Sequence, residues 1–291
     1  MEIFINSDLQ IVNKKRLSGI NMMKVLEIHG SGGDSTILIG EGLKNLREHL
    51  PVGKVVVITD ANVRAIYQKD FPDCDVIEIG TGEKIKTLET VQGIYQNLLA
   101  HEADRSTFIV GIGGGIVCDV TGFVASTYMR GLRFGFVPST LLSQVDASVG
   151  GKNGVNFGGY KNIVGVFNQP EFVICDHSLL RTLPKNELLC GFAEIVKHAV
   201  IGDAGLFSYL EAHHEKALRL DDEVITKLVY DSVVLKASIV NRDEKEEGER
   251  MKLNFGHTFG HAIEKISGLP HGEAVSIGMV FLARYAFNLY T

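Results

Sequence analysis

The segment TFIVGIGGG, residues 107–115, is the most informative part of this chain about its fold. Its apolar, β-branched half is typical of a strand buried in a parallel sheet. Three consecutive glycines follow, and the pattern predicts a helix over residues 117–128. Backbone without Cβ atoms can approach a phosphate closely, and a helix N-terminus offers it free N–H groups. The segment therefore predicts either a nucleotide-phosphate site or a tight structural turn, although its spacing is not the usual GxGxxG.

Strands and helices alternate on both sides of this segment, as in a parallel α/β sheet. Ser139 and Thr140 follow one predicted strand and are suitable N-cap residues for a helix through Val145. Asp60 ends another, where a carboxylate either binds a ribose or caps a turn. The predicted strands are residues 54–59, 74–80, 107–115 and 132–138, with a helix over residues 87–101.

After Asp176 the pattern changes to amphipathic helices, predicted over residues 185–201, 206–218, 223–241, 256–266 and 273–290. The predicted fold is an α/β Rossmann-like parallel-sheet domain, residues 1–178, followed by an all-α domain, residues 179–291. We expect residues 1–22 to be a non-native leader, with Met22 or Met23 as the true start. The apolar end at Phe287, Leu289 and Tyr290 predicts a chain truncated at its C-terminus.

Composition excludes several classes of protein. The chain has 291 residues and a net charge of −6 without an extended basic stretch, which argues against a nucleic-acid surface. Glycines cluster at residues 111–115 and 150–159. Basic residues recur beside these clusters, at Arg130, Arg133, Lys152 and Lys161, which suits a small anionic substrate. No apolar run reaches the ~18 residues of a membrane span. Four cysteines without a CxxC motif indicate a cytoplasmic protein with reduced thiols.

Histidines near the C-terminus predict a metal site. NFGHTFGHAIE, residues 254–264, places His257 and His261 four residues apart, on one face of a helix. His271 precedes the next helix, and Glu194 lies on an earlier one. Imidazoles with one carboxylate suit Zn²⁺ and leave a position open for substrate or water.

Spacing alone leaves the ligand set open. Glu194 and His198 are also four residues apart, so they form a rival pair. Glu273 is a further possible oxygen ligand. The segment GEKIK, residues 82–86, is by itself typical of an exposed charge cluster.

Six segments in succession resemble the 3-dehydroquinate synthases, a family of sugar-phosphate cyclases. The resemblance runs in order from about residue 54 to the end of the chain. It implies an enzyme that uses NAD and Zn²⁺, or Co²⁺, and acts as a homodimer in which Arg130 reaches the neighbouring subunit. The segments are GGGIVCDVTGFVASTYMRG (113–131), PSTLLSQVDASVGGKNGVN (138–156), GYKNIVGVFNQP (159–170), GFAEIVKHAVI (191–201), LNFGHTFGHAIE (253–264) and HGEAVSIGM (271–279).

The resemblance also implies a role for individual residues. His261 becomes a substrate-site residue rather than a ligand, and His198 a local helix residue. Lys161 is implied both as a substrate-site residue and as a cofactor contact. The implied metal ligands are Glu194, His257 and His271. The implied NAD contacts are Asp60, Glu83, Lys86, Gly114, Gly115, Asp119, Ser139, Thr140, Asp146 and Lys161. The implied catalytic and substrate residues are Lys152, Asn162, Lys197, His261, Arg130, Lys236, Arg250 and Asn254.

The implied substrate, 3-deoxy-D-arabino-heptulosonate 7-phosphate, carries a carboxylate and a phosphate and needs cations for each. Arg250 and Lys236 suit the carboxylate. His261 and Lys197 are the expected proton carriers. The expected reaction is transient oxidation by NAD, β-elimination of phosphate, re-reduction, ring opening and aldol closure to 3-dehydroquinate. The expected phosphate contacts are Lys152, Asn162, Arg130 and His261.

Three alternatives remain at the level of sequence. Another cyclase, of the 2-deoxy-scyllo-inosose or valiolone type, would not need the Arg250 and Lys236 pair. A metal-dependent polyol dehydrogenase would not need Lys152 and Asn162, which favour phosphate elimination. The third alternative is an inactive, truncated binding module.

Overall fold

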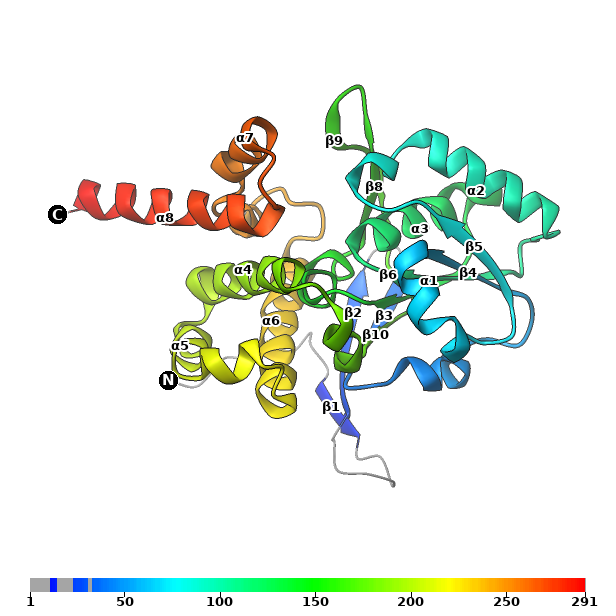
Figure 1. Cartoon of the computed structure of the whole chain (residues 1–291), viewed down its shortest axis with the longest axis horizontal. Helices are drawn as coiled ribbons and strands as arrows, with labels where there is room; N and C mark the ends of the chain where they lie inside the picture. Colours follow the sequence, from blue (N-terminus) through cyan, green and yellow to red (C-terminus); the bar gives the residue numbers. More distant parts are fainter. Residues whose placement is uncertain (1–10, 15–22, 31–32, 291) are drawn as a thin grey trace.

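The computed structural model describes residues 11–14, 23–30 and 33–290. Figure 1 shows an α/β part built around a sheet and, beside it, a part made of helices that includes the C-terminus. The sheet has eight strands in the order β1-β2-β3-β10-β7-β6-β4-β5. They are β1 (Ile11–Lys14), β2 (Met23–Gly30), β3 (Gly33–Ile39), β4 (Val55–Asp60), β5 (Asp75–Ile79), β6 (Phe108–Gly113), β7 (Phe134–Pro138) and β10 (Phe172–Cys175).

The longer helices follow the amphipathic segments of the sequence. In the α/β part they are α1 (Ala61–Tyr67), α2 (Leu88–Ala100) and α3 (Gly115–Thr127). In the helical part they are α4 (Lys185–Gly202), α5 (Ala204–Leu218), α6 (Asp222–Arg242), α7 (His257–Ser267) and α8 (His271–Tyr290). The predicted α/β sheet followed by helices is confirmed.

Strand β6 lies in the middle of the parallel part of the sheet, and all six of its residues are buried. Helix α3 begins two residues later and packs close against it. A Cβ on Gly113 would lie 2.5 Å from Cγ2 of Val117 on α3. This approach requires glycine, so part of the glycine cluster has a structural role in joining strand to helix.

The sheet is not parallel throughout. Strands β1, β2 and β3 pair antiparallel, and the parallel pairing begins where β3 meets β10. A separate antiparallel hairpin consists of β8 (Lys152–Phe157) and β9 (Tyr160–Phe167), with Gly158 and Gly159 at its turn. The sequence analysis predicted neither feature, because the direction of strand pairing depends on contacts between segments and glycine-rich runs resemble loops.

Two predictions concern the ends of the chain. Within residues 1–22, residues 11–14 form β1 and pair with β2, while the remainder lies outside the described residues. At the other end, Phe281, Tyr285, Phe287 and Leu289 of α8 are exposed. The domain boundary between residues 178 and 179 stays a prediction. No helix in the described part of the chain is long and apolar enough to cross a membrane.

Candidate metal and substrate site

Three helices bring the predicted metal ligands together. Glu194 lies on α4 and is fully buried, whereas His257 and His271 are the first residues of α7 and α8. The N-terminus of α8 can approach α4 because residue 272 is glycine. A Cβ there would lie 2.3 Å from the Cα of Cys190. A short turn between α7 and α8 then returns the chain to the same place.

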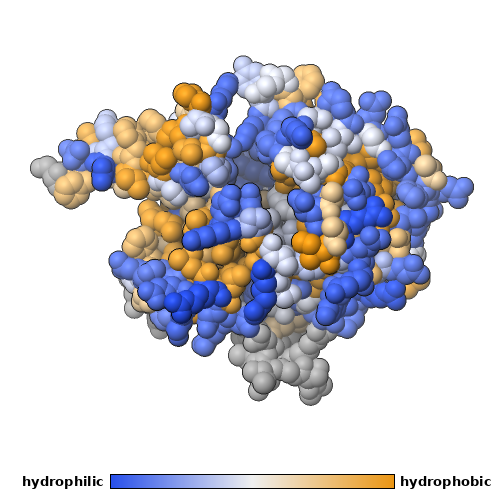
Figure 2. All heavy atoms as spheres, viewed as in Figure 1, coloured by the Kyte–Doolittle hydropathy of each residue, from blue (hydrophilic) through white to orange (hydrophobic). Residues whose placement is uncertain are grey.

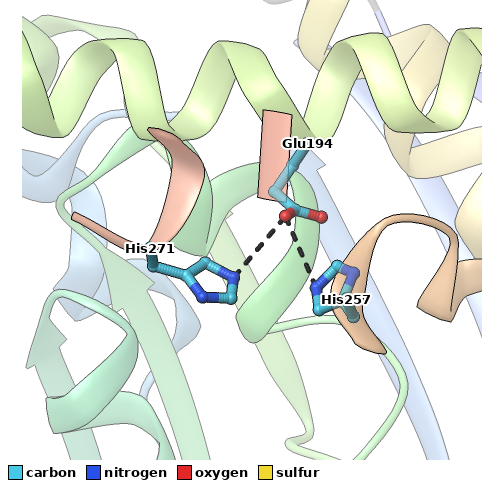
Figure 3. A group of neighbouring side chains, drawn as sticks. All are labelled: Glu194, His257 and His271. Carbon is cyan, nitrogen blue, oxygen red and sulfur yellow. Dashed lines mark ion pairs between the residues drawn. The ribbon is translucent and has the colours of Figure 1, made fainter. Parts of the chain in front are cut away.

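The three side chains converge on one point (Figure 3). Nε2 of His257 and Nε2 of His271 each lie 3.7 Å from Oε1 of Glu194, and the ligand atoms are all within 4.8 Å of one another. Both Glu194 oxygens are buried and have no hydrogen-bond partner of normal geometry among the described residues. Two imidazoles and a buried carboxylate fit a Zn²⁺ or Co²⁺ ion with an open coordination position.

Two of these groups are in the protonation state that metal binding requires. Burial raises the pKa of Glu194, but the Lys197 ammonium and the two imidazoles outweigh it and lower this pKa to about 2. Burial, assisted by the Lys197 charge, lowers the pKa of His257 to about 4. Burial also lowers the pKa of His271, but its contacts with Glu194 and Glu264 raise it above the ordinary value. At neutral pH Glu194 is therefore ionised and His257 neutral, as metal ligands must be.

Two other groups of possible ligands lie beside this cluster. His261 and His271 group with Glu264, and Glu194 groups with His198 and Asp146. The His261 ring lies 5.4 Å from that of His257 and 5.9 Å from that of His271. Glu273 is exposed and belongs to none of the three groups found among the described residues.

Asp146 is the centre of a charge network beside the metal cluster, which consists of Glu194, His257 and His271. Its Oδ1 lies 2.7 Å from Nζ of Lys236, 3.8 Å from Nζ of Lys197 and 3.5 Å from Nε2 of His198. Burial raises the pKa of Asp146, but the two ammonium groups hold it well below the ordinary value. Lys197 also contacts Glu194, so the network joins the helix α6 to the metal ligands through α4.

Two of the predicted substrate residues, Lys152 and Asn254, share one acidic partner. Glu246 contacts Lys152, and its Oε1 accepts a hydrogen bond from Asn254 at 2.7 Å. Arg250 is only 2% exposed and donates to the backbone carbonyls of Glu244 and Gly150, the latter at 2.9 Å. In this conformation its guanidinium donates hydrogen bonds to the protein backbone, where the prediction had it bind the substrate carboxylate.

The predicted NAD contacts lie along the ends of the parallel strands and the hairpin. Gly114 is the N-cap of α3, and Gly115 is its first residue. Lys86 is buried and contacts Asp119 and Asn162, the latter in the left-handed region at φ 53°.

Other predicted NAD contacts have structural partners here. Asp60 caps α1 by accepting hydrogen bonds from the N–H groups of residues 62 and 63. The side chain of Thr140 accepts from the Ser143 N–H at 3.1 Å, as expected for an N-cap. Ser139 N–H donates to the carbonyl of Gly113 at 2.8 Å. Glu83 accepts from Asn156 at 2.8 Å.

Arg130 lies apart from these residues. It is exposed, follows α3 in the left-handed region at φ 69°, and no contact in the described part of the chain joins it to the site.

The sequence analysis missed two acidic residues. Glu246 lies in the acidic run DEKEEGE, where nothing distinguishes one carboxylate from its neighbours. Glu264 is different, because it follows His261 by three residues and His257 by seven. That spacing places all three on one side of α7 and was a usable signal.

A hollow lies between the helical part and the α/β part, with hydrophilic side chains along much of its rim (Figure 2). The hairpin β8–β9 and α7 both rise on this side of the molecule (Figure 1). They meet where Nζ of Lys161 lies 2.7 Å from Oε1 of Glu264. The α/β part thus contacts the metal cluster through its hairpin.

Two solved structures that this chain resembles are sugar-phosphate cyclases. A 2-deoxy-scyllo-inosose synthase complexed with carbaglucose-6-phosphate, NAD⁺ and Co²⁺ aligns with a TM-score of 0.80 and 27% identity, covering 91% of this chain and 77% of that one. The 2-epi-5-epi-valiolone synthase ValA from Streptomyces hygroscopicus subsp. jinggangensis 5008, with NAD⁺ and Zn²⁺ bound, aligns with a TM-score of 0.78 and 28% identity, covering 91% and 75%. Fold and site together define the sugar-phosphate cyclase class.

Sequence comparison resolves the family within this class. Residues 76–190 match the 3-dehydroquinate synthase N-terminal family and residues 191–291 the C-terminal family. A 3-dehydroquinate synthase of Dehalococcoides mccartyi strain CBDB1 is 44% identical over 282 residues, which is 92% of this chain and 79% of the relative. One from Caldanaerobacter subterraneus subsp. tengcongensis is 47% identical over 255 residues, 84% of this chain and 72% of the relative. The chain belongs to the 3-dehydroquinate synthase family of carbon–oxygen lyases.

Proposed function

We propose that this chain converts 3-deoxy-D-arabino-heptulosonate 7-phosphate to 3-dehydroquinate and phosphate, as a lyase of the shikimate pathway, with the cofactors and residue roles given below. The convergence of Glu194, His257 and His271 carries the proposal. Among the described residues, it is the place where a buried carboxylate oxygen, Oε1 of Glu194, faces two imidazoles. Family membership selects this activity over the inosose, valiolone and polyol alternatives.

Glu194, His257 and His271 would hold Zn²⁺ or Co²⁺, which supplies Lewis acidity toward substrate hydroxyl groups. The glycine bend before α3, with Lys86, Asp119 and the hairpin, would hold NAD, which supplies a reversible hydride acceptor. We assign the α/β part, residues 1–178, to the nucleotide and the helical part, residues 179–291, to metal and substrate.

The chain's own residues would bind and orient the substrate. Lys152 and Asn254 now contact Glu246, so an incoming substrate anion would replace that carboxylate as their partner. Asn162 on the hairpin would complete the phosphate contacts. Such placement of charges, rather than one strong base, would provide most of the rate enhancement.

Proton transfer would fall to residues beside the metal cluster. Burial and the neighbouring His271 charge lower the pKa of His261, which keeps it a neutral acceptor at physiological pH. Burial lowers the pKa of Lys197, but Asp146 and Glu194 outweigh it and raise this pKa, so Lys197 stays a cation and a proton donor. Lys236 and Arg250 would face the substrate carboxylate once it is bound.

The proposal includes a homodimer in which Arg130 of each chain acts in the site of the other. Arg130 is exposed and has no contact with the site of its own chain in the described residues. An exposed cation in a fixed left-handed turn suits a role in the site of a second copy.

The test is release of inorganic phosphate from the heptulosonate phosphate by the purified chain, with and without NAD⁺ and with a metal chelator. We expect release that requires both cofactors and produces no net NADH. Release that is insensitive to the chelator would contradict the metal role. Net NADH formation from a polyol would indicate a dehydrogenase instead.

A further inference from the structure

The two histidines of the metal cluster present the same ring nitrogen to Glu194. Nε2 of His257 and Nε2 of His271 both face Oε1 of that carboxylate (Figure 3). A neutral imidazole has one protonated nitrogen, so a ring that binds a metal through Nε2 must carry its proton on Nδ1. The group beside Nδ1 therefore determines which nitrogen is available to the ion.

Each Nδ1 has an acceptor beside it. For His257 the acceptor is a backbone group, the carbonyl oxygen of Phe255, at 3.3 Å. For His271 it is a side chain, because Oε2 of Glu264 lies 3.6 Å from Nδ1. This separation is just outside hydrogen-bond range and within the range of an ion pair. An ionised carboxylate only accepts hydrogen bonds, so it selects the tautomer with the proton on Nδ1.

Glu264 is fixed in this position from its other side. Its Oε1 accepts a hydrogen bond from Nζ of Lys161 on β9 at 2.7 Å. One oxygen of the carboxylate thus contacts the hairpin and the other contacts His271. Helix α7 therefore carries a metal ligand at its first residue and, two turns later, the acceptor for the ligand on α8.

We propose that Glu264 is a positioning residue that holds the proton of His271 on Nδ1 and so presents Nε2 to the metal. The inference rests on the proposed function in that Glu194, His257 and His271 are taken as the ligands. The competing assignment makes Glu264 itself a ligand, together with His261 and His271.

The first test is the Zn²⁺ affinity of the purified full chain, measured by competition with a chromogenic chelator. Glu264→Gln keeps the shape of the side chain and removes its charge, and we expect the affinity to fall about 10–100-fold. The matched control is Glu273→Gln, which removes the same charge from an exposed position two residues after His271. We expect the control to change the affinity by less than about twofold. Equal affinities of Glu264→Gln and the unaltered chain would overturn the proposal.

The Co²⁺ absorption spectrum separates a positioning role from ligation. At saturating Co²⁺, Glu264→Gln should retain the absorption bands of the unaltered chain, whereas His257→Ala should lose them. Altered bands in Glu264→Gln together with retained bands in His257→Ala would make Glu264 a ligand and overturn the proposal. The thermal unfolding midpoints of the metal-free variants test whether a change in the absorption bands comes from misfolding.

A measurement on the unaltered chain makes the test independent of any variant. The ¹⁵N chemical shifts of the zinc-loaded protein should show His271 protonated at Nδ1 and bound to the metal at Nε2. The reverse tautomer would overturn the role of Glu264 while leaving phosphate release intact. Failure of the unaltered chain to bind one metal ion would overturn the proposed function as well.

Discussion

At the scale of single residues, the site depends on buried charges that balance one another. Asp146 is surrounded by Lys197, Lys236 and His198, and Glu194 by Lys197 and two imidazoles. Removing one member of such a network leaves an uncompensated buried charge. This destabilises the fold more than replacing the whole pair by apolar residues would. These groups are therefore constrained by stability as well as by chemistry.

Metal affinity should depend on pH through His271. His257, with a pKa of about 4, is already neutral at physiological pH, whereas the pKa of His271 is raised above its ordinary value. Above the His271 pKa no proton has to leave, so affinity should be constant there. Below it one proton must be displaced, and affinity should fall about tenfold per pH unit. Chelator competition between about pH 8 and 5.5 measures this, and a flat profile would contradict the prediction.

At the scale of elements, the position of the ligands depends on how closely α7, α8 and α4 approach. A Cβ on Gly278 of α8 would lie 2.2 Å from the carbonyl oxygen of Gly256, which precedes α7. A Cβ on Gly260 would meet the Cα of Val275 at 2.9 Å. Because these contacts involve backbone atoms, rotamer changes cannot relieve them. The α7–α8 pair is thus a rigid support for His257 and His271.

Gly278→Ala should separate α7 from α8, lower the free energy of unfolding by about 1–3 kcal/mol and weaken Zn²⁺ binding. The control is Gly93→Ala on α2, where an added Cβ meets nothing within 4 Å. It should instead stabilise the fold by up to about 1 kcal/mol, because alanine favours helix. Urea unfolding of the metal-free variants compares the two, and equal stabilities would show that the helices adjust.

At the scale of the whole molecule, the site lies where the two parts of the chain meet. The hairpin β8–β9 extends from the α/β part and contacts α7 through Lys161 and Glu264 (Figure 1). The network around Asp146 makes a second link, from the segment after β7 to α4 and α6. Residues far apart in the chain therefore meet here, as Lys161 and Glu264 do across 103 residues.

The proposed dimer predicts complementation between two inactive variants. Arg130→Ala removes a residue that would act in the partner's site, and Lys152→Ala removes one that acts in its own. Random mixing makes half of the dimers mixed, and each mixed dimer has one intact site, so activity should recover to about one quarter of the unaltered level. Phosphate release before and after subunit exchange measures this. A mixture no more active than its components would place Arg130 in the site of its own chain.

The amino-acid sequence alone determined the class of fold and the types of residue at the site. Alternation of apolar strands with helices, the triple glycine before α3, and histidines at helical spacing are local patterns, and local patterns set secondary structure. The ordered segments of the resemblance identified the family. The acceptor roles of Glu264 and Glu246 and the backbone contacts of Arg250 were decided only by the tertiary structure. They depend on contacts between segments far apart in the chain, and the identity of a carboxylate or guanidinium does not reveal which distant group will lie beside it.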